Sequence, residues 1–392
     1  MSITSAYIHI PFCRRRCFYC DFPITVLGNN AGGKYSPWQR EYVDFLCQEI
    51  LTINNIKSVP LETVFFGGGT PSLLAVEGLE KILVTLENHF SFAQNIEISM
   101  EIDPATFSLE QLRTYQTLGV NRISLGGQSF DDYLLQECGR SHCTKDTYQS
   151  VEYIHQVGID NWSLDLISGL PHQTITHWED SLLKAIDLKP KHLSCYDLVI
   201  ESGTVFGKKY QAGDKPLPQD YTTAQMYRLG STILQENGYN HYEICNYAQE
   251  GYHCKHNLVY WHNQPYYGFG MGAASYTQKQ RFSRPRTRKE YFEFVNQLII
   301  NKGKIDHEST TPTEELLDTL MLGLRLKEGV NLLSIEKKFG TDTVSQIIKT
   351  LQAPIEQKLV IFSNNSKNLR LSDPEGFLYS NSVLTELFIE FE

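Results

Sequence analysis

Three cysteines stand close together near the start of the 392-residue chain, with the spacing C-x-x-x-C-x-x-C. They are Cys13, Cys17 and Cys20, in the segment IHIPFCRRRCFYCDFP of residues 8–23. Thiolates gathered in one short loop select soft or borderline metals, which means zinc or an iron–sulfur cluster. A structural zinc site needs a fourth cysteine or histidine, whereas a cubane cluster held by three cysteines keeps one iron open to another ligand. The spacing therefore favours a cubane cluster.

The other candidate ligands give a weaker signal. Cys47 lies in a helix-like stretch and is predicted to pack in the core as a small hydrophobe. Cys138 and Cys143 flank the tetrapeptide GRSH and could form half of a metal site, but two unrelated thiols near a loop are the simpler interpretation. His9 is close to the cysteine loop in sequence, but side chains alternate along a strand, so His9 need not face the loop.

The cysteine loop follows the first of six strand-like runs that alternate with helical patterns. The runs are residues 6–10, 62–68, 96–102, 120–127, 161–169 and 192–200. The helical patterns are residues 37–54, 76–89, 108–118, 146–157 and 176–187. Such units in series imply a parallel sheet with right-handed crossovers. We therefore predict an α/β fold built as a partial (β/α)6 barrel, with a doubly wound open sheet as the alternative.

Polar and glycine-rich segments follow these strands at the point where each strand ends. GGGTP (67–71) follows the second strand, EIDP (101–104) the third and GGQSFD (126–131) the fourth, while Asp165 lies near the end of the fifth. In parallel α/β folds ligands bind at the carboxyl ends of the strands. Together with the cysteine loop, these segments predict one binding site at that rim.

Composition excludes several classes of function. The net charge is −10 and no long run of Lys or Arg stands out, so we expect no nucleic-acid partner. No stretch of eighteen apolar residues predicts a transmembrane helix, although peripheral membrane contact stays open. The first residues lack the pattern of a secretory signal, and nine cysteines without a disulfide framework are typical of a reducing compartment. We therefore expect a cytoplasmic protein.

The chain changes character after the sixth strand. A polar loop (207–220) and a helix (221–237) precede an aromatic-rich segment, and from about residue 310 the pattern is helix, turn, two helices and a hairpin. That order is typical of a winged helix, but no basic recognition helix is present, so we expect a structural or docking domain. The predicted division is 1–205 for the barrel, 206–305 for the extension and 306–392 for a smaller C-terminal α+β domain.

The motifs together support a family assignment. The cysteine spacing, with the aromatic Tyr19 before the last cysteine and GGGTP after the second strand, resembles the radical S-adenosylmethionine superfamily. The further motifs are YIHIPFC, FFGGGTPSLL, EIDPATF, NRISLGGQSF, LDLISGLPHQT and HNLVYW. This set is similar to the oxygen-independent coproporphyrinogen III oxidase family, in its haem-chaperone branch, the HemW-type proteins. The resemblance covers essentially the whole chain.

The resemblance implies a 4Fe–4S cluster on Cys13, Cys17 and Cys20, with S-adenosylmethionine chelating the open iron. By matching position, the residues implied near S-adenosylmethionine are Tyr7, Tyr19, Gly68, Gly69, Thr70, Glu101, Gln128, Arg140 and Asp165. Glycines permit close backbone approach, and carboxylates suit ammonium and ribose hydroxyl groups. The alternative for the acidic residues is a strand-end turn or surface charge, and for Arg140 a solvated loop. We expect Arg14, Arg15 and Arg16 to be solvated loop cations.

Phe22 separates two branches of that family. Members of the oxidase branch carry a further cysteine two residues after the third ligand, and a longer segment before the cluster loop. This chain has Phe22 at that position, and twelve residues precede Cys13. Both departures argue against decarboxylation of porphyrinogen propionates. The chaperone branch shares the phenylalanine and the short start.

The motif H-N-x-x-Y-W, which the chaperone branch also shows, predicts where haem binds. It consists of His256, Asn257, Tyr260 and Trp261. Neutral imidazole is a common axial ligand of haem iron, and aromatic rings offer flat contact to a porphyrin. His256 is therefore the expected haem ligand, with the thiolate of Cys254 as an alternative and with His253 and His262 as rivals. The opposing interpretation is an aromatic core in which His256 is hydrogen-bonded.

The sequence as a whole predicts a haem chaperone that binds haem and delivers it to an acceptor protein, carrying a 4Fe–4S cluster with exchangeable S-adenosylmethionine. Two alternatives are an oxygen-independent coproporphyrinogen III oxidase and a radical S-adenosylmethionine methyltransferase-like enzyme. Whether the chain is an enzyme stays open, and no catalytic residue is assigned. We expect a monomer or a homodimer.

Overall fold

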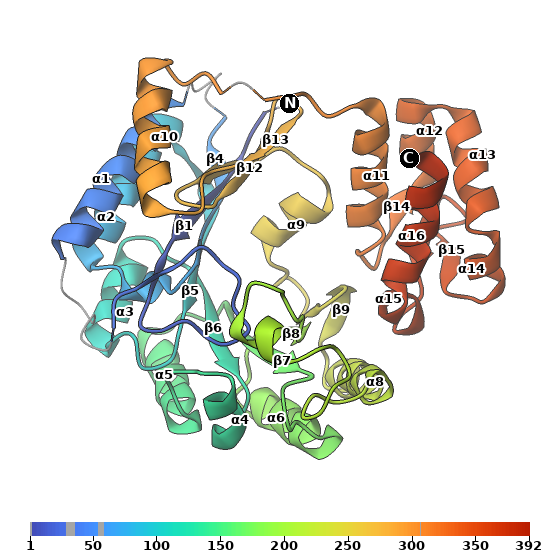
Figure 1. Cartoon of the computed structure of the whole chain (residues 1–392), viewed down its shortest axis with the longest axis horizontal. Coiled ribbons are helices and arrows are strands. Elements are labelled where there is room, and N and C mark those ends of the chain that lie inside the picture. Colours follow the sequence, from blue (N-terminus) through green and yellow to red (C-terminus); the bar gives the residue numbers. More distant parts are fainter. Residues whose placement is uncertain (1, 29–35, 54–58, 306) are drawn as a thin grey trace.

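A computed structural model of the chain describes residues 2–28, 36–53, 59–305 and 307–392 (Figure 1). Six parallel strands form its centre. They are β1 (Ser5–Ile10), β4 (Leu61–Gly68), β5 (Phe92–Ile102), β6 (Arg122–Gln128), β7 (Trp162–Ser168) and β8 (His192–Asp197). Each strand pairs with the next one in the chain, without a reversal of order. The predicted partial barrel is therefore confirmed, and the doubly wound alternative, which needs such a reversal, is wrong.

The helices between these strands cover the outer face of the barrel (Figure 1). They are α1 (Pro37–Thr52), α2 (Val76–Phe90), α3 (Leu109–Thr117), α4 (Asp132–Glu137), α5 (Thr144–Val157) and α6 (Ile175–Asp187), with a 3-10 turn η1 (Pro71–Leu73). Hydroxyl caps fix where several begin: the side chain of Ser36 accepts from the N–H of Gln39, and that of Thr174 from the N–H of His177. Apolar faces of strands and helices share one large core, in which Cys47 is buried as predicted.

The same sheet continues beyond the six predicted strands. On one side β11 (Tyr267–Phe269) pairs in parallel with β1, and on the other β10 (Asn246–Ala248) and β9 (Asn240–Glu243) add antiparallel strands beyond β8. The sheet therefore has nine strands. Strands of three or four residues inside an aromatic-rich segment carry too short a pattern to be predicted from sequence. The aromatic-rich extension is thus part of the barrel's own sheet.

Further elements of the extension pack around the barrel. They are α7 (Val205–Lys209), α8 (Asp220–Glu236), α9 (Lys255–Trp261) and α10 (Arg288–Ile300), with the hairpin β12 (Ala274–Thr277) and β13 (Gln280–Ser283). The α9 helix, which carries the HNLVYW motif, contacts β4 on one side and the C-terminal domain on the other. Figure 1 shows it between these two bodies. This helix therefore closes the barrel at the amino ends of its strands.

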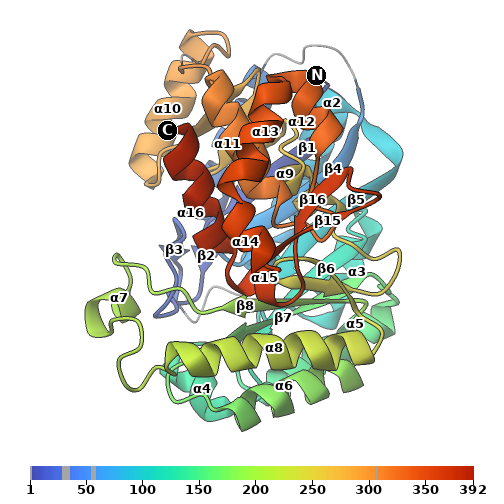
Figure 2. The ribbon, with the colours of Figure 1, turned by 90° about the vertical axis from the view of Figure 1, so that its right-hand side faces the viewer.

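The C-terminal domain has a hydrophobic core of its own and faces the viewer in Figure 2. Its elements are α11 (Pro312–Gly323), β14 (Val330–Asn331), α12 (Leu332–Phe339), α13 (Thr341–Thr350), α14 (Gln352–Glu356), β15 (Val360–Ser363), β16 (Asn368–Leu371), α15 (Glu375–Leu378) and α16 (Ser380–Phe391). A three-stranded sheet and the β15–β16 hairpin confirm the winged-helix-like prediction. Ion pairs join the domain to the barrel side; they include Arg228 with Glu375, Lys279 with Glu315 and Arg281 with Asp318.

Within the described ranges, every helix is too short or too polar to cross a bilayer.

Candidate functional site

The cysteine loop begins directly after β1. Cys13 ends the short strand β2 (Phe12–Cys13), which pairs with β3 (Thr25–Val26). The loop is also held to neighbouring segments, because the N–H of Phe18 donates to the carbonyl of Cys138 at 3.0 Å. Cys13 is buried, while Cys17 and Cys20 are half-buried, and all three are free thiols. The loop therefore presents three thiols on the carboxyl-end rim.

The donor set of this loop fits a three-thiolate cluster better than a zinc ion. Among the described residues, no three His, Cys, Asp or Glu side chains close around a single ion. A cubane spreads its thiolates over three irons, so they need not converge on one point. His9 cannot complete a zinc site from where it lies, because its Nε2 atom bonds the carbonyl of Pro23 at 2.9 Å and its Nδ1 atom the hydroxyl of Tyr7 at 3.1 Å.

Two of the three thiols each accept a hydrogen bond from a neighbouring side chain. The hydroxyl of Thr70 donates to Sγ of Cys13, and Nη1 of Arg140 donates to Sγ of Cys17, each at 3.6 Å. Burial raises the pKa of Cys13 to about 12, so a bound metal has to stabilise the thiolate form. Donors of this kind orient ligating sulfur atoms and tune a cluster.

The glycines after β4 lie where no other residue fits. Gly68 has a φ of +109°, and a Cβ atom there would meet the ring of His9 at 2.3 Å. A Cβ atom on Gly69 would meet the carbonyl oxygen of Phe12 at 2.8 Å. The segment therefore packs directly against the cysteine loop. Its N–H groups are engaged within the protein, since Gly68 donates to Oε2 of Glu101 at 3.0 Å and Thr70 to the carbonyl of Phe12 at 2.7 Å.

Two carboxylates face a cavity of about 210 Å³ inside the mouth of the barrel. Glu101 ends β5, and its surroundings raise its pKa to about 8, through burial first and the charge of Asp165 second. Asp165 of β7 accepts hydrogen bonds from the hydroxyls of Ser124, at 2.9 and 3.1 Å, and Ser163, at 3.2 Å. Burial raises the pKa of Asp165 as well. Held apart from bulk water, these groups suit a ligand that brings ammonium or hydroxyl groups.

Arg140 lies inside the site and is not a solvated loop cation, because its side chain is only 7% exposed. Its Nη2 atom is 2.5 Å from Oδ1 of Asp103 and donates to the carbonyl of Gly126 at 3.0 Å. Asp103 also accepts from the hydroxyl of Thr70 at 3.1 Å. Asp103 was missed as a site residue, although its position in EIDP at a strand end gave the same signal as Glu101.

The predicted contact residues for S-adenosylmethionine form two neighbouring groups. Tyr7, Gly68, Glu101 and Asp165 line the cavity. The others lie beside the cysteine loop or at the end of β6, outside that lining; they are Tyr19, Gly69, Thr70, Gln128 and Arg140. Gln128 has a φ of +65°, which marks a sharp bend where β6 ends. Tyr7 and Asp165 lie within β1 and β7 and reach the cavity from inside the barrel, while the other seven positions lie at or near the carboxyl ends of the strands.

Phe22 and one arginine shape the mouth of the cavity. Phe22 is 60% exposed and lines the cavity at its open side. The guanidinium of Arg16 donates to the carbonyls of Cys20, at 3.1 Å, and Phe22, at 2.9 Å. Arg16 is thus exposed, as expected, but it also fastens the end of the cysteine loop. The aromatic side chain is free to contact a ligand at the rim.

The HNLVYW motif lies at the opposite end of the barrel, where Asn257 and Tyr260 line the inner part of the same cavity. The side chain of Glu97 accepts from the N–H groups of Lys255, at 3.3 Å, and His256, at 3.2 Å, which caps the start of α9. The ring of His256 is fully buried; its Nδ1 atom bonds the hydroxyl of Thr63 and its Nε2 atom that of Tyr260, each at 2.8 Å. Burial lowers the pKa of His256 to about 3, so the ring is neutral. Both ring nitrogens are therefore engaged within the protein.

The other candidate haem ligands differ in exposure. Cys254 is fully buried, and burial raises the pKa of its thiol to about 12. His262 lies at the surface, 3.7 Å from a carboxylate oxygen of Glu328. The ring of His253 is stacked on that of Tyr242, with 4.2 Å between centroids, and lines an open groove. The structure does not bring these side chains together with His256 around one point.

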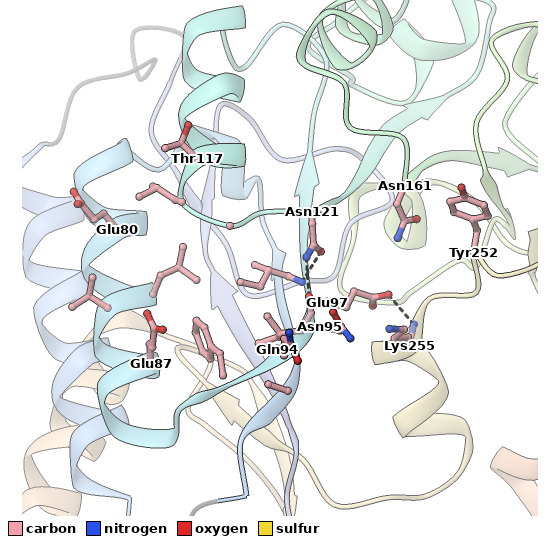
Figure 3. A pocket seen from close by; sticks show the side chains of 18 of the residues that line it. Glu80, Glu87, Gln94, Asn95, Glu97, Thr117, Asn121, Asn161, Tyr252 and Lys255 are labelled. Carbon is pink, nitrogen blue, oxygen red and sulfur yellow. Dashed lines mark hydrogen bonds between the residues drawn. The ribbon is translucent and has the colours of Figure 1, made fainter.

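That groove, of about 960 Å³, runs across the amino ends of β5 to β7 (Figure 3). Its walls are mainly polar, and Figure 3 shows Glu80 and Glu87 on one side and Lys255 on the other. The side chain of Asn121 pairs with the edge of β5, where it bonds the N–H of Ile98 at 2.9 Å and the carbonyl of Ile96 at 2.8 Å. The groove is thus separate from the cavity at the mouth.

Comparisons with known proteins agree with this geometry. The family model of the Radical SAM superfamily matches residues 7–185, and that of the HemN C-terminal domain matches residues 310–378. A solved structure, coproporphyrinogen III oxidase (HemN) from Escherichia coli, a radical SAM enzyme, has a TM-score of 0.82 and 21% identity, covering 98% of this chain and 90% of that chain. At this identity the match establishes the fold alone.

Three curated relatives cover nearly the whole chain. "Heme chaperone HemW" of Synechocystis sp. is 45% identical, over 99% of this chain and 97% of the relative. The protein of the same name in Bacillus subtilis is 36% identical, over 97% of each. "Radical S-adenosyl methionine domain-containing protein 1, mitochondrial" of Bos taurus is 30% identical, over 97% of this chain and 86% of the relative.

Proposed function

The chain belongs to the haem chaperone HemW family, and from this premise we propose that it binds haem and delivers it to an acceptor protein, while it carries a 4Fe–4S cluster and S-adenosylmethionine. The observation that carries the proposal is the 45% identity to a haem chaperone along almost the full length. The oxidase that shares the fold is only 21% identical. Phe22, exposed at the mouth of the cavity, supports the same choice.

We propose that Cys13, Cys17 and Cys20 hold the cluster. Their support is the set of three free thiols, two of them with a hydrogen-bond donor, at the rim of a radical SAM domain. When bound, the cluster supplies an open iron that chelates S-adenosylmethionine and an electron for its reductive cleavage. Arg140 and Thr70 hold two of the sulfur atoms in position.

The cavity behind the loop is the proposed site of S-adenosylmethionine. Glu101 and Asp165 offer carboxylates to its ammonium and hydroxyl groups, while Tyr7 forms part of the wall. Gly68 lines the same cavity, and because it has no Cβ the ring of His9 can pack directly against it. We propose that the remaining positions contact the part of the same ligand that lies next to the cluster. They are Tyr19, Gly69, Thr70, Gln128 and Arg140.

Haem ligation by His256, or by Cys254 as the alternative, stays a prediction. In the arrangement described, a haem iron that bonds His256 has to displace the hydroxyl of Thr63 or that of Tyr260. His253 has no such bond among the described residues and lines an open groove, so it is the control that any test of His256 requires.

The remaining proposals concern the location of the protein, its haem acceptor, its division into domains and its oligomeric state. We propose a cytoplasmic location, since the cluster thiols have to stay reduced, and a protein acceptor for the haem. The division into residues 1–205, 206–305 and 306–392 is proposed with two supports: the match to the HemN C-terminal domain at 310–378 and the separate hydrophobic core there. Monomer and homodimer both fit the proposal.

The test is anaerobic reconstitution followed by three measurements on one preparation. We expect about four irons and matching sulfide per chain, an EPR signal that S-adenosylmethionine changes, and haem binding around the micromolar range, about −8 kcal/mol. Such an affinity allows both sequestration and release. The same preparation is expected to leave coproporphyrinogen III unchanged. A single zinc without sulfide would refute the cluster, and protoporphyrinogen formation would make the oxidase the better assignment.

A further inference from the structure

Arg122, the first residue of β6, lies at the inner end of the cavity in the barrel mouth. Its side chain is almost completely buried, with 2% of the residue exposed. Its Nε atom has no hydrogen-bond partner, and no described carboxylate forms an ion pair with its guanidinium. Two other enclosed arginines contrast with it: Arg140 pairs with Asp103 at 2.5 Å, and Arg284 with Glu49 at 2.7 Å.

The acidic groups around Arg122 are engaged by other donors. Glu97 caps the start of α9, with both oxygens accepting N–H groups. Asp165 accepts from Ser124 and Ser163. Burial disfavours the charged guanidinium, and the charges of Glu97 and Asp165 favour it from a distance, but neither completes its hydrogen bonds. A buried cation without full hydrogen bonding is destabilising, so an acceptor that enters at this point gains a strong hydrogen bond.

The cavity has room for that acceptor and a path to it. Its volume of about 210 Å³ is many times the 10–15 Å³ that one water molecule requires in comparable measure. Arg122 lines the inner end, whereas Phe22 and Tyr196, which are 60% and 41% exposed, line the outer end. A group that enters past these two aromatic side chains therefore reaches the guanidinium.

We propose that this cavity is a binding site for a carboxylate group and that Arg122 is the cation that receives it. A guanidinium matches a carboxylate with two parallel hydrogen bonds. A singly charged anion fits best, because Arg122 is, among the described residues, the one cation in the lining of the cavity and the acidic side chains of Glu101 and Asp165 share that lining. Arg140 is not the alternative cation, since Asp103 already holds it.

The inference rests on the proposed function for the origin of the carboxylate. Haem brings two propionates, and S-adenosylmethionine brings the carboxylate of its amino-acid end. The structure identifies Arg122 as the residue that receives the carboxylate. Experiment decides whether that carboxylate belongs to haem or to S-adenosylmethionine.

The experiment compares ligands with and without the carboxylate in reconstituted protein. One arm titrates haem against its dimethyl ester, followed by absorbance, and the other titrates S-adenosylmethionine against its decarboxylated form, followed by calorimetry. The variants are Arg122→Gln and Arg122→Lys, with Arg113→Gln on the exposed side of α3 as the matched control. Iron chelation by the amino-acid end contributes to wild type and variants alike, so it cancels in the comparison.

For the ligand whose carboxylate reaches Arg122, we expect Arg122→Gln to reduce the preference for the carboxylate form at least tenfold. Arg122→Lys should keep part of that preference, because an ammonium keeps the charge and loses the paired geometry. Arg113→Gln should match wild type. If the Gln variant does not fold, the Lys variant alone has to lower the preference measurably.

Two failures are distinguishable. If wild type binds haem and S-adenosylmethionine but both preferences are unchanged in the Arg122 variants, Arg122 is only a structural counter-charge and the inference is overturned. If wild type binds no haem, the proposed function fails, while the S-adenosylmethionine arm still decides whether Arg122 receives a carboxylate.

Discussion

The two ends of the barrel differ in whether their polar side chains face open space or bond to other parts of the protein. At the carboxyl end, Glu101 and Asp165 face an open cavity, and the cysteine thiols stand at the rim. At the amino end, Glu97 and His256 form their hydrogen bonds with other groups of the protein, and these bonds connect β4, β5 and α9. Glu97 and His256 thus close the base of the barrel, while the cavity extends from the rim inward to Arg122 and Tyr260.

This difference shows that a motif in the sequence does not by itself tell whether its side chains are free to bind a ligand. Both ends carry short motifs of cysteine, histidine and aromatic residues, and both were predicted to bind metal-containing groups. The rim presents its thiols and acidic side chains to open space, whereas His256, the proposed ligand at the other end, has both ring nitrogens engaged within the protein. Groups with perturbed pKa values gather at functional sites, but a fully satisfied histidine with a lowered pKa is equally typical of a core.

The largest effect that tests this contrast is loss of the cluster. Replacing Cys13, Cys17 or Cys20 by Ala is expected to reduce the iron content of reconstituted protein from about four per chain to background, because each thiolate holds a separate iron. Iron and sulfide analysis with EPR measures the result. Cys47→Ala, in the core of the barrel, should reconstitute normally. A cluster that survives in all three rim variants would exclude this loop as its site.

The second effect concerns the base. His256→Ala removes the partner of two buried hydroxyls and leaves a cavity beside Phe65, so we expect a loss of about 4 kcal/mol in the free energy of unfolding. Urea unfolding measures this loss. His253→Ala, with its ring half-buried, is the matched control and should cost much less.

The same variant decides the role of His256 in haem binding. A purely structural role predicts that folded His256→Ala protein keeps the haem affinity and visible spectrum of wild type. A changed spectrum in folded His256→Ala, with an unchanged one in His253→Ala and His262→Ala, would make His256 the haem ligand and break the contrast between the two ends.

The third effect is pH dependence at the rim. The pKa of Glu101 is raised to about 8, so between about pH 5 and pH 8 the folded protein keeps a proton that the unfolded chain has released. The free energy of unfolding of wild type should therefore fall as pH rises through this window. Glu101→Gln lacks this titration, and its stability relative to wild type should increase by about 3 kcal/mol from pH 5 to pH 8.

Thermal or urea unfolding at several pH values measures this difference in apoprotein. Glu110→Gln, on the exposed surface of α3, is the control and should follow wild type. Parallel pH profiles for wild type and Glu101→Gln would mean that Glu101 is ionised at neutral pH and not held protonated by its surroundings.

The smallest expected effect is that of Cys254→Ala at the base. Its thiol is buried and makes weak contacts, among them one of 3.9 Å to Oε1 of Glu97, so we expect a loss of about 1 kcal/mol in the free energy of unfolding. The haem spectrum should not change. A spectrum that loses thiolate features in this variant would instead assign Cys254 as a haem ligand.

The sequence by itself determined the parts of the molecule that depend on neighbouring residues. The six long strands and the five main helices follow from hydrophobic periods that act within ten to fifteen residues. The three-cysteine loop is equally local, because its spacing is contained in eight residues. The rim also followed from sequence, since parallel strands necessarily present their carboxyl ends on one side.

Tertiary structure alone decided the pairings between distant segments. Three short strands of the extension became part of the central sheet, although their own patterns are too short to predict. Arg140 forms an ion pair with Asp103 and is buried beside the cysteine loop, although a solvated loop position was the alternative from sequence. Thr63 and His256, 193 positions apart, share a hydrogen bond that engages the motif's histidine. The Nε atom of Arg122 has no hydrogen-bond partner, and its acidic neighbours accept from other donors. Such partnerships depend on which side chains the folded chain brings within about 3 Å, and no local pattern encodes that.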